Sequence, residues 1–115
     1  MAELVVNERQ AGDVTILDLT GEVRLGDSAV ALRTSTRKLA DGGKKKILLN
    51  LADVKYIDST GIGELIASYT TVTREGGQLK LLNLTDRIQN LLVITKLLTV
   101  FDAYDNEAEA LKSFQ

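Results

Sequence analysis

The sequence predicts an α/β fold built on a mainly parallel sheet. First, short runs rich in Val, Ile, Leu and Thr alternate with segments of helical periodicity along the 115 residues. Second, two such runs, 3–9 and 13–21, are separated only by "QAG", which predicts a hairpin. Third, the run 44–51 opens with three lysines and then becomes continuously apolar, as expected of a central strand covered on both faces. The helices then serve as crossover connections between parallel strands.

Two of the predicted helices have clear boundary signals. The segment 26–43 has Asp27 or Ser28 as its N-cap and a pair of glycines at its end, and the segment 85–97 has Thr85 as its N-cap. The residues expected to face inward are Ala29, Leu32, Thr36 and Leu39 in the first segment and Ile88, Leu91, Leu92 and Thr95 in the second.

The remaining elements are shorter. The run 76–84 predicts a strand, and 99–105 predicts a short edge strand. The segment 106–114 predicts a terminal helix, because Asn106 and Glu109 have the spacing of a capping box. We expect residues 1–115 to form a single domain, since this length suits one hydrophobic core.

The composition excludes several classes of protein. Hydrophobic residues make up 44% and charged residues 26% of the chain, as in an ordinary globular protein. A formal net charge of -2 argues against a nucleic-acid partner bound through its phosphates. No apolar run approaches the length of a membrane span, and the N-terminus does not resemble a signal peptide. We therefore expect a cytoplasmic protein with no membrane or nucleic-acid partner.

The absence of two residue types bears on catalysis. There is no Cys, which excludes disulfides, thiolate metal sites and cysteine nucleophiles. There is no His, which removes the usual general base, the commonest transition-metal ligand and any Ser-His-Asp triad. We expect no enzymatic activity, no metal site and no cofactor.

The stretch "KYIDSTGIGEL" (55–65) leads from the loop after the central strand into a helix that begins at Ser59. At about 100° per residue, one side of this helix is the core face. Its residues are Ile62, Leu65, Ile66, Tyr69 and Val72. A different side is exposed, smooth and nearly uncharged, and it carries Ser59, Gly63, Ala67 and Thr70.

Ser59 has two interpretations. It can be the N-cap of the helix, with Asp58 complementing the helix dipole. It can also present its hydroxyl to another molecule. Two glycines in the first turns, Gly61 and Gly63, each cost roughly 0.5–1 kcal/mol relative to alanine. Close packing on the sheet can explain such a glycine, but Gly63 lies on the exposed side, where its missing side chain lets another protein approach closely.

Three segments carry a family resemblance: "LTGEV" (19–23), "ILLNLADVKYIDSTGIGEL" (47–65) and "GGQLKLLNLTDRIQNLLVITKLLTVFDAYDNEAEAL" (76–111). They resemble the STAS domain and, within it, the bacterial anti-sigma-factor antagonists. The resemblance covers nearly the whole chain, and its most specific part is "DSTG". It implies a four- to five-stranded mixed sheet with helices mainly on one face.

The resemblance also implies a regulatory role in transcription. In this family the serine of the matching motif, here Ser59, is phosphorylated by an anti-sigma factor with ATP-dependent serine kinase activity. The unphosphorylated antagonist binds that anti-sigma factor and releases the sigma factor. Phosphorylation ends the binding, and a serine phosphatase restores it. The partner-binding residues are then Glu22, Arg24, Asp58, Thr60, Gly61, Gly63 and Ala67.

Arg24 departs from the family pattern. Many members continue the "GE" of "LTGEV" with an apolar residue and then Asp, whereas "GEVRLGDS" has Arg24 at that place. The expected charge is therefore reversed, and Asp27 is the nearby residue that would compensate. We expect Arg24, in place of Asp, to affect which partner the protein recognises.

Two alternatives use the same residues differently. The first is a STAS scaffold or small-ligand-binding module that has no phosphorylation cycle. The second is a small hydrolase with Ser59 as nucleophile, whose base would have to be Asp58, Asp53 or a lysine, and an unassisted serine is a weak nucleophile.

Overall fold

The computed structural model describes residues 4–115. Five strands and four α-helices follow one another with one short 3₁₀ helix before the last strand. Their bounds are β1 Leu4–Ala11, β2 Val14–Val23, α1 Asp27–Asp41, β3 Lys46–Ile57, α2 Ser59–Arg74, β4 Gln78–Leu82, α3 Asp86–Ile94, η1 Leu98–Val100, β5 Ala103–Tyr104 and α4 Glu107–Ser113.

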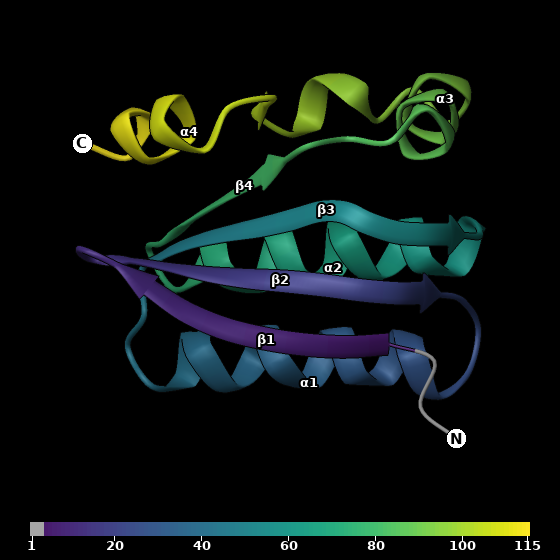
Figure 1. Ribbon diagram of the computed structural model, residues 1–115. Coiled ribbons are helices and arrows are strands. Elements are labelled where there is room, and N and C mark those ends of the chain that lie inside the picture. Colours follow the sequence, from purple (N-terminus) through teal and green to yellow (C-terminus); the bar gives the residue numbers. More distant parts are fainter. Residues whose placement is uncertain (1–3) are drawn as a thin grey trace.

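The strands form one mixed sheet in the order β1-β2-β3-β4-β5. β1 and β2 are the expected hairpin, antiparallel, with Leu4 opposite Gly21 and Ala11 opposite Val14. The other neighbours are all parallel, so helices α1, α2 and the α3 segment are crossover connections. This confirms the predicted α/β class and the mixed five-stranded sheet. In Figure 1 the carboxyl ends of β2 and β3 point the same way, toward the starts of α1 and α2.

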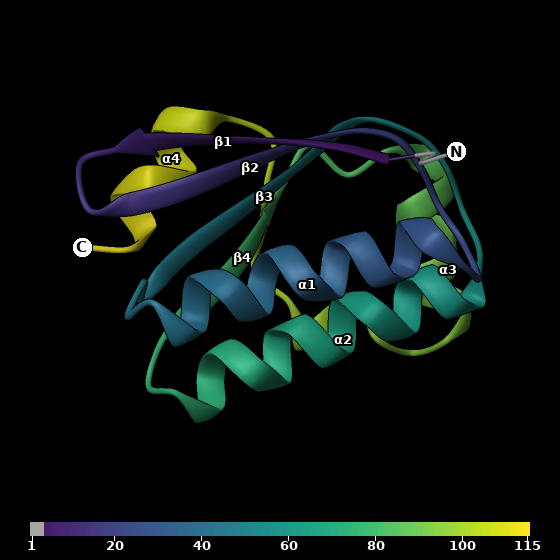
Figure 2. The same ribbon diagram turned by 90° about the horizontal axis from the view of Figure 1, so that it is seen from below.

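The helices cover the two faces of the sheet unequally. α1 and α2 lie side by side on one face, and α4 lies on the other (Figure 2). Alternate residues of β3 point to opposite faces. Ile47 and Leu49 join the large core under α1 and α2, and Leu48 joins a smaller cluster with Ala110 of α4 and Phe114 just after it. The central strand is therefore covered on both faces, as predicted, although most of the helical mass lies on one. No helix within residues 4–115 is long and apolar enough to cross a membrane.

β3 is longer than the sequence suggested. Residues 54–57 were expected in a loop, but they continue β3 and pair with the end of β2, where Val23 lies opposite Ile57. The register shifts twice along this pair, so the regular alternation is broken. Val54 and Ile57 are nevertheless buried in the main core, which explains why the strand continues.

Two helix boundaries also differ from the expectation. Neither Asp27 nor Ser28 caps α1: its N-cap is Gly26, and the Ser28 hydroxyl instead accepts a hydrogen bond from the Arg24 amide at 2.9 Å. α3 ends at Ile94, so the prediction that Thr95 faces inward was wrong, and that residue is exposed. The chain turns there because Lys96 adopts a positive φ of 62°.

Candidate functional site

Ser59 is the first residue of α2, at the end of the sheet where β2 and β3 finish. β3 ends at Ile57, and the amide of Asp58 donates a hydrogen bond to the carbonyl of Val23 at the end of β2. The loop from β2 to α1 therefore lies beside the start of α2. This arrangement brings residues 22–25 next to Asp58 and Ser59, although more than thirty positions separate them in the sequence.

Asp58, rather than Ser59, is the N-cap of α2. Its Oδ1 accepts the Gly61 amide at 2.8 Å, and its Oδ2 accepts the Leu25 amide at 3.2 Å. Burial raises the pKa of Asp58, but the hydrogen bonds from the amides of Gly61, Leu25 and Thr60, together with the Arg24 charge, lower it more. Asp58 is therefore held as a carboxylate, and the interpretation of Ser59 as the cap was wrong. The Ser59 side chain is exposed.

The two glycines of "GIG" have different surroundings. Gly61 is buried, and a Cβ there would lie 2.6 Å from Cγ1 of Ile57 and would also collide with the carbonyl oxygen of Val23. Gly61 therefore lets α2 pack closely on the ends of β2 and β3. A Cβ at Gly63 would meet no atom within 4 Å, so that glycine leaves open surface.

The phase of α2 agrees with the sequence analysis. Ile62, Leu65 and Val72 are buried in the main core, and Ile66 and Tyr69 pack against it. The side with Ser59, Gly63, Ala67 and Thr70 is exposed, and Thr60 is half-buried beside it. We refer to Ser59, Gly63, Ala67 and Thr70 as the exposed strip.

Polar contacts join α2 to α1 along the side of α2 next to the exposed strip. Glu64 is buried and accepts two hydrogen bonds from Arg33, both at 2.8 Å. Farther along the same seam, the hydroxyls of Thr36 and Ser68 are 2.9 Å apart. Because the acid next to the strip is paired in this way, the strip itself presents little charge.

Arg24 lies in a cluster that the sequence pattern did not reveal. Its guanidinium pairs with Glu22 at 2.8 Å and lies 4.4 Å from the centre of the Tyr56 ring. The Arg87 guanidinium lies 4.1 Å from the same ring, and its Nε donates to the carbonyl of Ile57 at 3.0 Å. Arg87 belongs to the first turn of α3, and only the parallel arrangement of β3 and β4 brings that turn to this end of the sheet.

Exposed apolar side chains adjoin the same region. Leu25 is 77% exposed, although its amide is bonded to Asp58, and Val30 on α1 is 50% exposed. Asp27, in the first turn of α1, is exposed as well. Sequence reasoning missed Leu25, whose signal was an apolar residue inside a short loop of polar residues and glycine.

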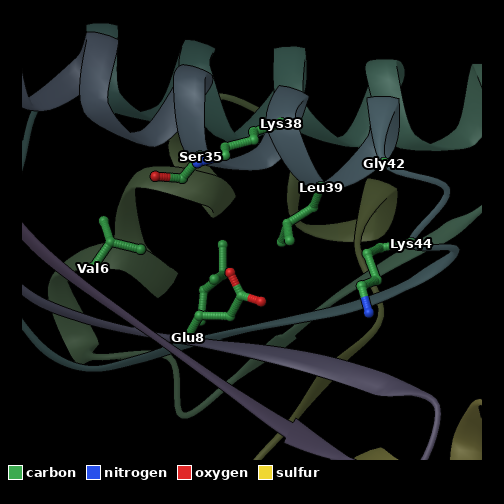
Figure 3. Close-up of a pocket in the computed structure, with 8 residues that line it drawn as sticks. Val6, Glu8, Ser35, Lys38, Leu39, Gly42 and Lys44 are labelled. Carbon is green, nitrogen blue, oxygen red and sulfur yellow. The ribbon is translucent and has the colours of Figure 1, made fainter.

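A hollow of about 340 Å³ lies elsewhere, between α1 and β1. Figure 3 shows Leu39 pointing from α1 toward the sheet, with Val6 and Glu8 on the strand and Lys44 beyond the end of the helix. None of the site residues predicted from the sequence lines it. It is a separate feature from the surface around Ser59.

Comparisons with known proteins agree with this fold. A model of the STAS domain family matches residues 6–110. The anti-sigma-B factor antagonist of Bacillus subtilis is 37% identical over 86 residues, which are 75% of this chain and 77% of that protein. A crystal structure of a candidate anti-sigma factor antagonist from Thermotoga maritima has a TM-score of 0.84 at 24% identity, over 95% of this chain and 93% of the other. The phosphorylated form of the Bacillus cell fate determinant SpoIIAA has a TM-score of 0.75 at 17% identity, over 96% and 100%.

The chain belongs to the STAS domain family, since the family model spans nearly all of it. Within that family it belongs with the anti-sigma factor antagonists, the regulatory proteins to which the Bacillus subtilis relative is assigned. The two solved structures support the fold alone, because their sequence identities are low.

Proposed function

We propose that this chain is a regulatory substrate whose phosphoacceptor is Ser59. In its unmodified form it binds an anti-sigma factor with serine kinase activity and thereby releases a sigma factor in the cytoplasm. Residues 1–115 act as one STAS domain. The observation that carries the proposal is the exposed Ser59 at the start of α2, beside open surface at Gly63, in a chain of this family.

The phosphotransfer step requires little from this chain. The Ser59 Oγ attacks the γ-phosphorus of an ATP bound to the anti-sigma factor, an O–P bond forms, and the bond to the ADP oxygen breaks. The hydroxyl proton goes to a base of the kinase. A phosphatase reverses the state by adding water across the new ester, which returns the serine and inorganic phosphate. The chain supplies the acceptor and its position, and it catalyses neither step.

The switch follows from charge. A phosphate adds about 1.5 to 2 negative charges where the unmodified surface carries a neutral hydroxyl. Ser59 is exposed and is not the residue that caps α2, so the fold tolerates the modification. A partner surface fitted to the exposed strip would meet a phosphate beside the Asp58 carboxylate. Binding is therefore lost at the interface rather than through unfolding.

The proposed contact surface combines the exposed strip with the adjoining loop. Glu22 and Arg24 flank Val23, whose carbonyl accepts the Asp58 amide. Thr60 lies at the edge of the surface, and Gly63 and Ala67 provide a smooth approach. Gly61 is buried, so it contributes through the close packing of α2 rather than through an exposed side chain.

The alternative is a STAS scaffold or ligand-binding module without a phosphorylation cycle. The hollow between α1 and β1 is the feature that favours it, because Val6 and Leu39 give it apolar walls and Lys44 a cationic rim. A scaffold of this kind takes up no phosphate at Ser59 when incubated with ATP and the captured partner.

The binding surface is tested by placing a charge on the exposed strip. Unmodified protein captures its partner from a lysate of the source organism, mass spectrometry identifies that partner, and calorimetry measures the affinity of the purified pair. Gly63→Arg should abolish binding while circular dichroism stays unchanged, because the new side chain enters open space. The control is Ala108→Arg, which adds the same charge at an exposed position on α4, across the sheet. Normal binding by folded Gly63→Arg protein would place the interface elsewhere.

A further inference from the structure

The positive charge of Arg24 lowers the pKa of Asp58, the residue directly before the proposed phosphoacceptor. The two residues that flank Arg24 each contact Asp58: the carbonyl of Val23 accepts the Asp58 amide at 3.3 Å, and the Leu25 amide donates to Asp58 Oδ2 at 3.2 Å. Asp58 directly precedes Ser59. Residue 24 is therefore held at the start of α2 by backbone contacts on both sides.

The side chain of Arg24 contacts an acid and an aromatic ring. Its ion pair with Glu22 is 38% and 37% exposed on the two sides, and it also lies against the Tyr56 ring. Exposed pairs of this kind exchange partners at little cost. A doubly charged phosphate is a stronger acceptor for a guanidinium than a single carboxylate, and its oxygens match the two parallel N–H donors of arginine.

The first turn of α2 supplies little competing stabilisation. Its amides ordinarily attract anions, but the Asp58 carboxylate already accepts the Gly61 amide at 2.8 Å. Asp58 also brings its own negative charge next to Ser59. A cationic side chain near a phosphate on Ser59 would therefore offset part of the negative charge of both groups.

We propose that Arg24 binds the phosphate of phosphorylated Ser59 within the same chain and gives up Glu22 to do so. The inference rests on the proposed role of Ser59 as phosphoacceptor and extends it to what the phosphate does. Phosphorylation then changes two parts of the surface at once: it adds charge at Ser59, and it withdraws Arg24 from the loop that also displays Leu25. Glu22 is left without this cation.

Other charged groups share this end of the molecule. They are Glu22 on β2, Asp27 on α1, Asp58 before α2, and Asp86 and Arg87 in the first turn of α3. Arg87 is the rival cation in the same cluster, since its guanidinium lies against the same Tyr56 ring. Its Nε is bonded to the Ile57 carbonyl, which limits its movement.

The test uses phosphoserine incorporated genetically at position 59, so it needs no kinase. ³¹P NMR follows the second ionisation of this phosphate, which has a pKa of about 6 in the absence of neighbours. In the Arg24→Gln protein that pKa should be about 0.3–0.7 higher than in the chain with Arg24, the size expected for a close but exposed ion pair. The Nε–H resonance of Arg24 should move with the same midpoint as the phosphate.

Arg37→Gln is the matched control, because Arg37 is exposed near the far end of α1, and it should leave the phosphate pKa unchanged. Equal pKa values in the Arg24→Gln and unsubstituted chains would overturn the proposal, provided that both give native circular dichroism. A change seen only in Arg87→Gln would overturn the assignment to Arg24. Failure of a kinase to phosphorylate Ser59 would instead contradict the proposed function and would leave this measurement unaffected.

Discussion

Asp58 holds the start of α2 and leaves the neighbouring Ser59 side chain exposed. Its two carboxylate oxygens bind amides from two different parts of the chain, Gly61 in the helix and Leu25 in the loop after β2. The geometry of the candidate site therefore depends on an acid rather than on the serine. Because the Ser59 hydroxyl does not cap α2, a modification of this hydroxyl would leave the cap of the helix in place.

Replacing Asp58 and Ser59 in turn separates their roles. Asp58→Ala should cost about 0.5–2 kcal/mol, the range for a lost cap. Ser59→Ala should stay within about 0.5 kcal/mol, because the residue is exposed and alanine is a good helix former. Urea unfolding measures both. A larger loss for Ser59→Ala than for Asp58→Ala would contradict the assignment of the cap.

The contribution of Asp58 should depend on pH in the acid range. Its pKa is lowered in the folded chain, so its contribution is present above the unfolded pKa of about 3.9 and is lost as the pH falls through the lowered value. The stability difference between the parent protein and Asp58→Ala should therefore shrink below about pH 4. Unfolding curves at pH 7 and pH 3 test this, and a difference that grows toward pH 3 would have the wrong sign.

The two glycines provide a matched pair. Gly61→Ala should cost at least about 1–3 kcal/mol, because the added methyl group meets Ile57 and the Val23 carbonyl and the helix must shift. Gly63→Ala should instead stabilise the protein by about 0.5–1 kcal/mol, since its surroundings are open and alanine favours the helix. Thermal unfolding compares them, and similar effects at the two positions would show that α2 does not lie as described.

At the scale of elements, α2 has a buried face and an exposed face with different roles. Its apolar face joins the main core through Ile62, Leu65 and Val72, and its other face is the exposed strip. The helical period alone was enough to predict this division. The alternation expected of a strand could not locate the end of β3, because the register with β2 shifts between Gly21 and Glu22, opposite Val54 and Tyr56.

Leu65→Ala tests the buried face of α2. Leu65 is fully buried, so the substitution should cost about 2–5 kcal/mol. Thr70→Ala is the control on the exposed strip and should change stability by less than about 0.5 kcal/mol. Denaturant midpoints with unchanged slopes would give both values. A midpoint for Leu65→Ala that cannot be distinguished from the parent would mean that the phase of α2 is wrong.

At the scale of the whole molecule, parallel strands bring distant segments to one end of the sheet. The residues before and after Ser59 could be predicted as a site from their own sequence, and so could Glu22 and Arg24 from the family pattern. Tyr56 and Arg87 could not, because nothing local marks them and only the order of the strands places Arg87 beside Tyr56. Sequence reasoning therefore located the exposed strip around the proposed acceptor but missed the aromatic ring that the two arginines contact.

On the opposite side of the molecule, one arginine joins the hairpin to the terminal helix. Arg9 on β1 pairs with Asp18 on β2 and with Glu107 on α4, each at 2.6 Å. Hydrogen bonding to Arg9 lowers the pKa of both acids more than their burial raises it, and it raises the pKa of Arg9 itself. The acids' contribution is thus present at neutral pH and is lost as the pH falls through their lowered pKa values.

Arg9→Gln should remove that dependence. All three side chains are substantially exposed, so the substitution should cost only about 1 kcal/mol or less at pH 7. The cost should be smaller at pH 3 than at pH 7, because the contribution of the two acids decreases as the pH falls below their unfolded pKa values and toward their lowered ones. Urea unfolding at the two pH values measures it, and Lys112→Gln, an exposed cation on α4, serves as the control. An undiminished cost at pH 3 would mean that Arg9 acts through packing instead.

Ser59 is the proposed phosphoacceptor of a regulatory switch, and mapping the phosphate tests this role most directly. The unmodified protein is incubated with ATP and the anti-sigma factor that it captures, and tandem mass spectrometry locates the modified residue. We predict one phosphate on Ser59 and none on the Ser59→Ala protein, which should still bind the partner. Phosphate on the adjacent Thr60, or undiminished phosphorylation of the Ser59→Ala protein, would contradict the claim.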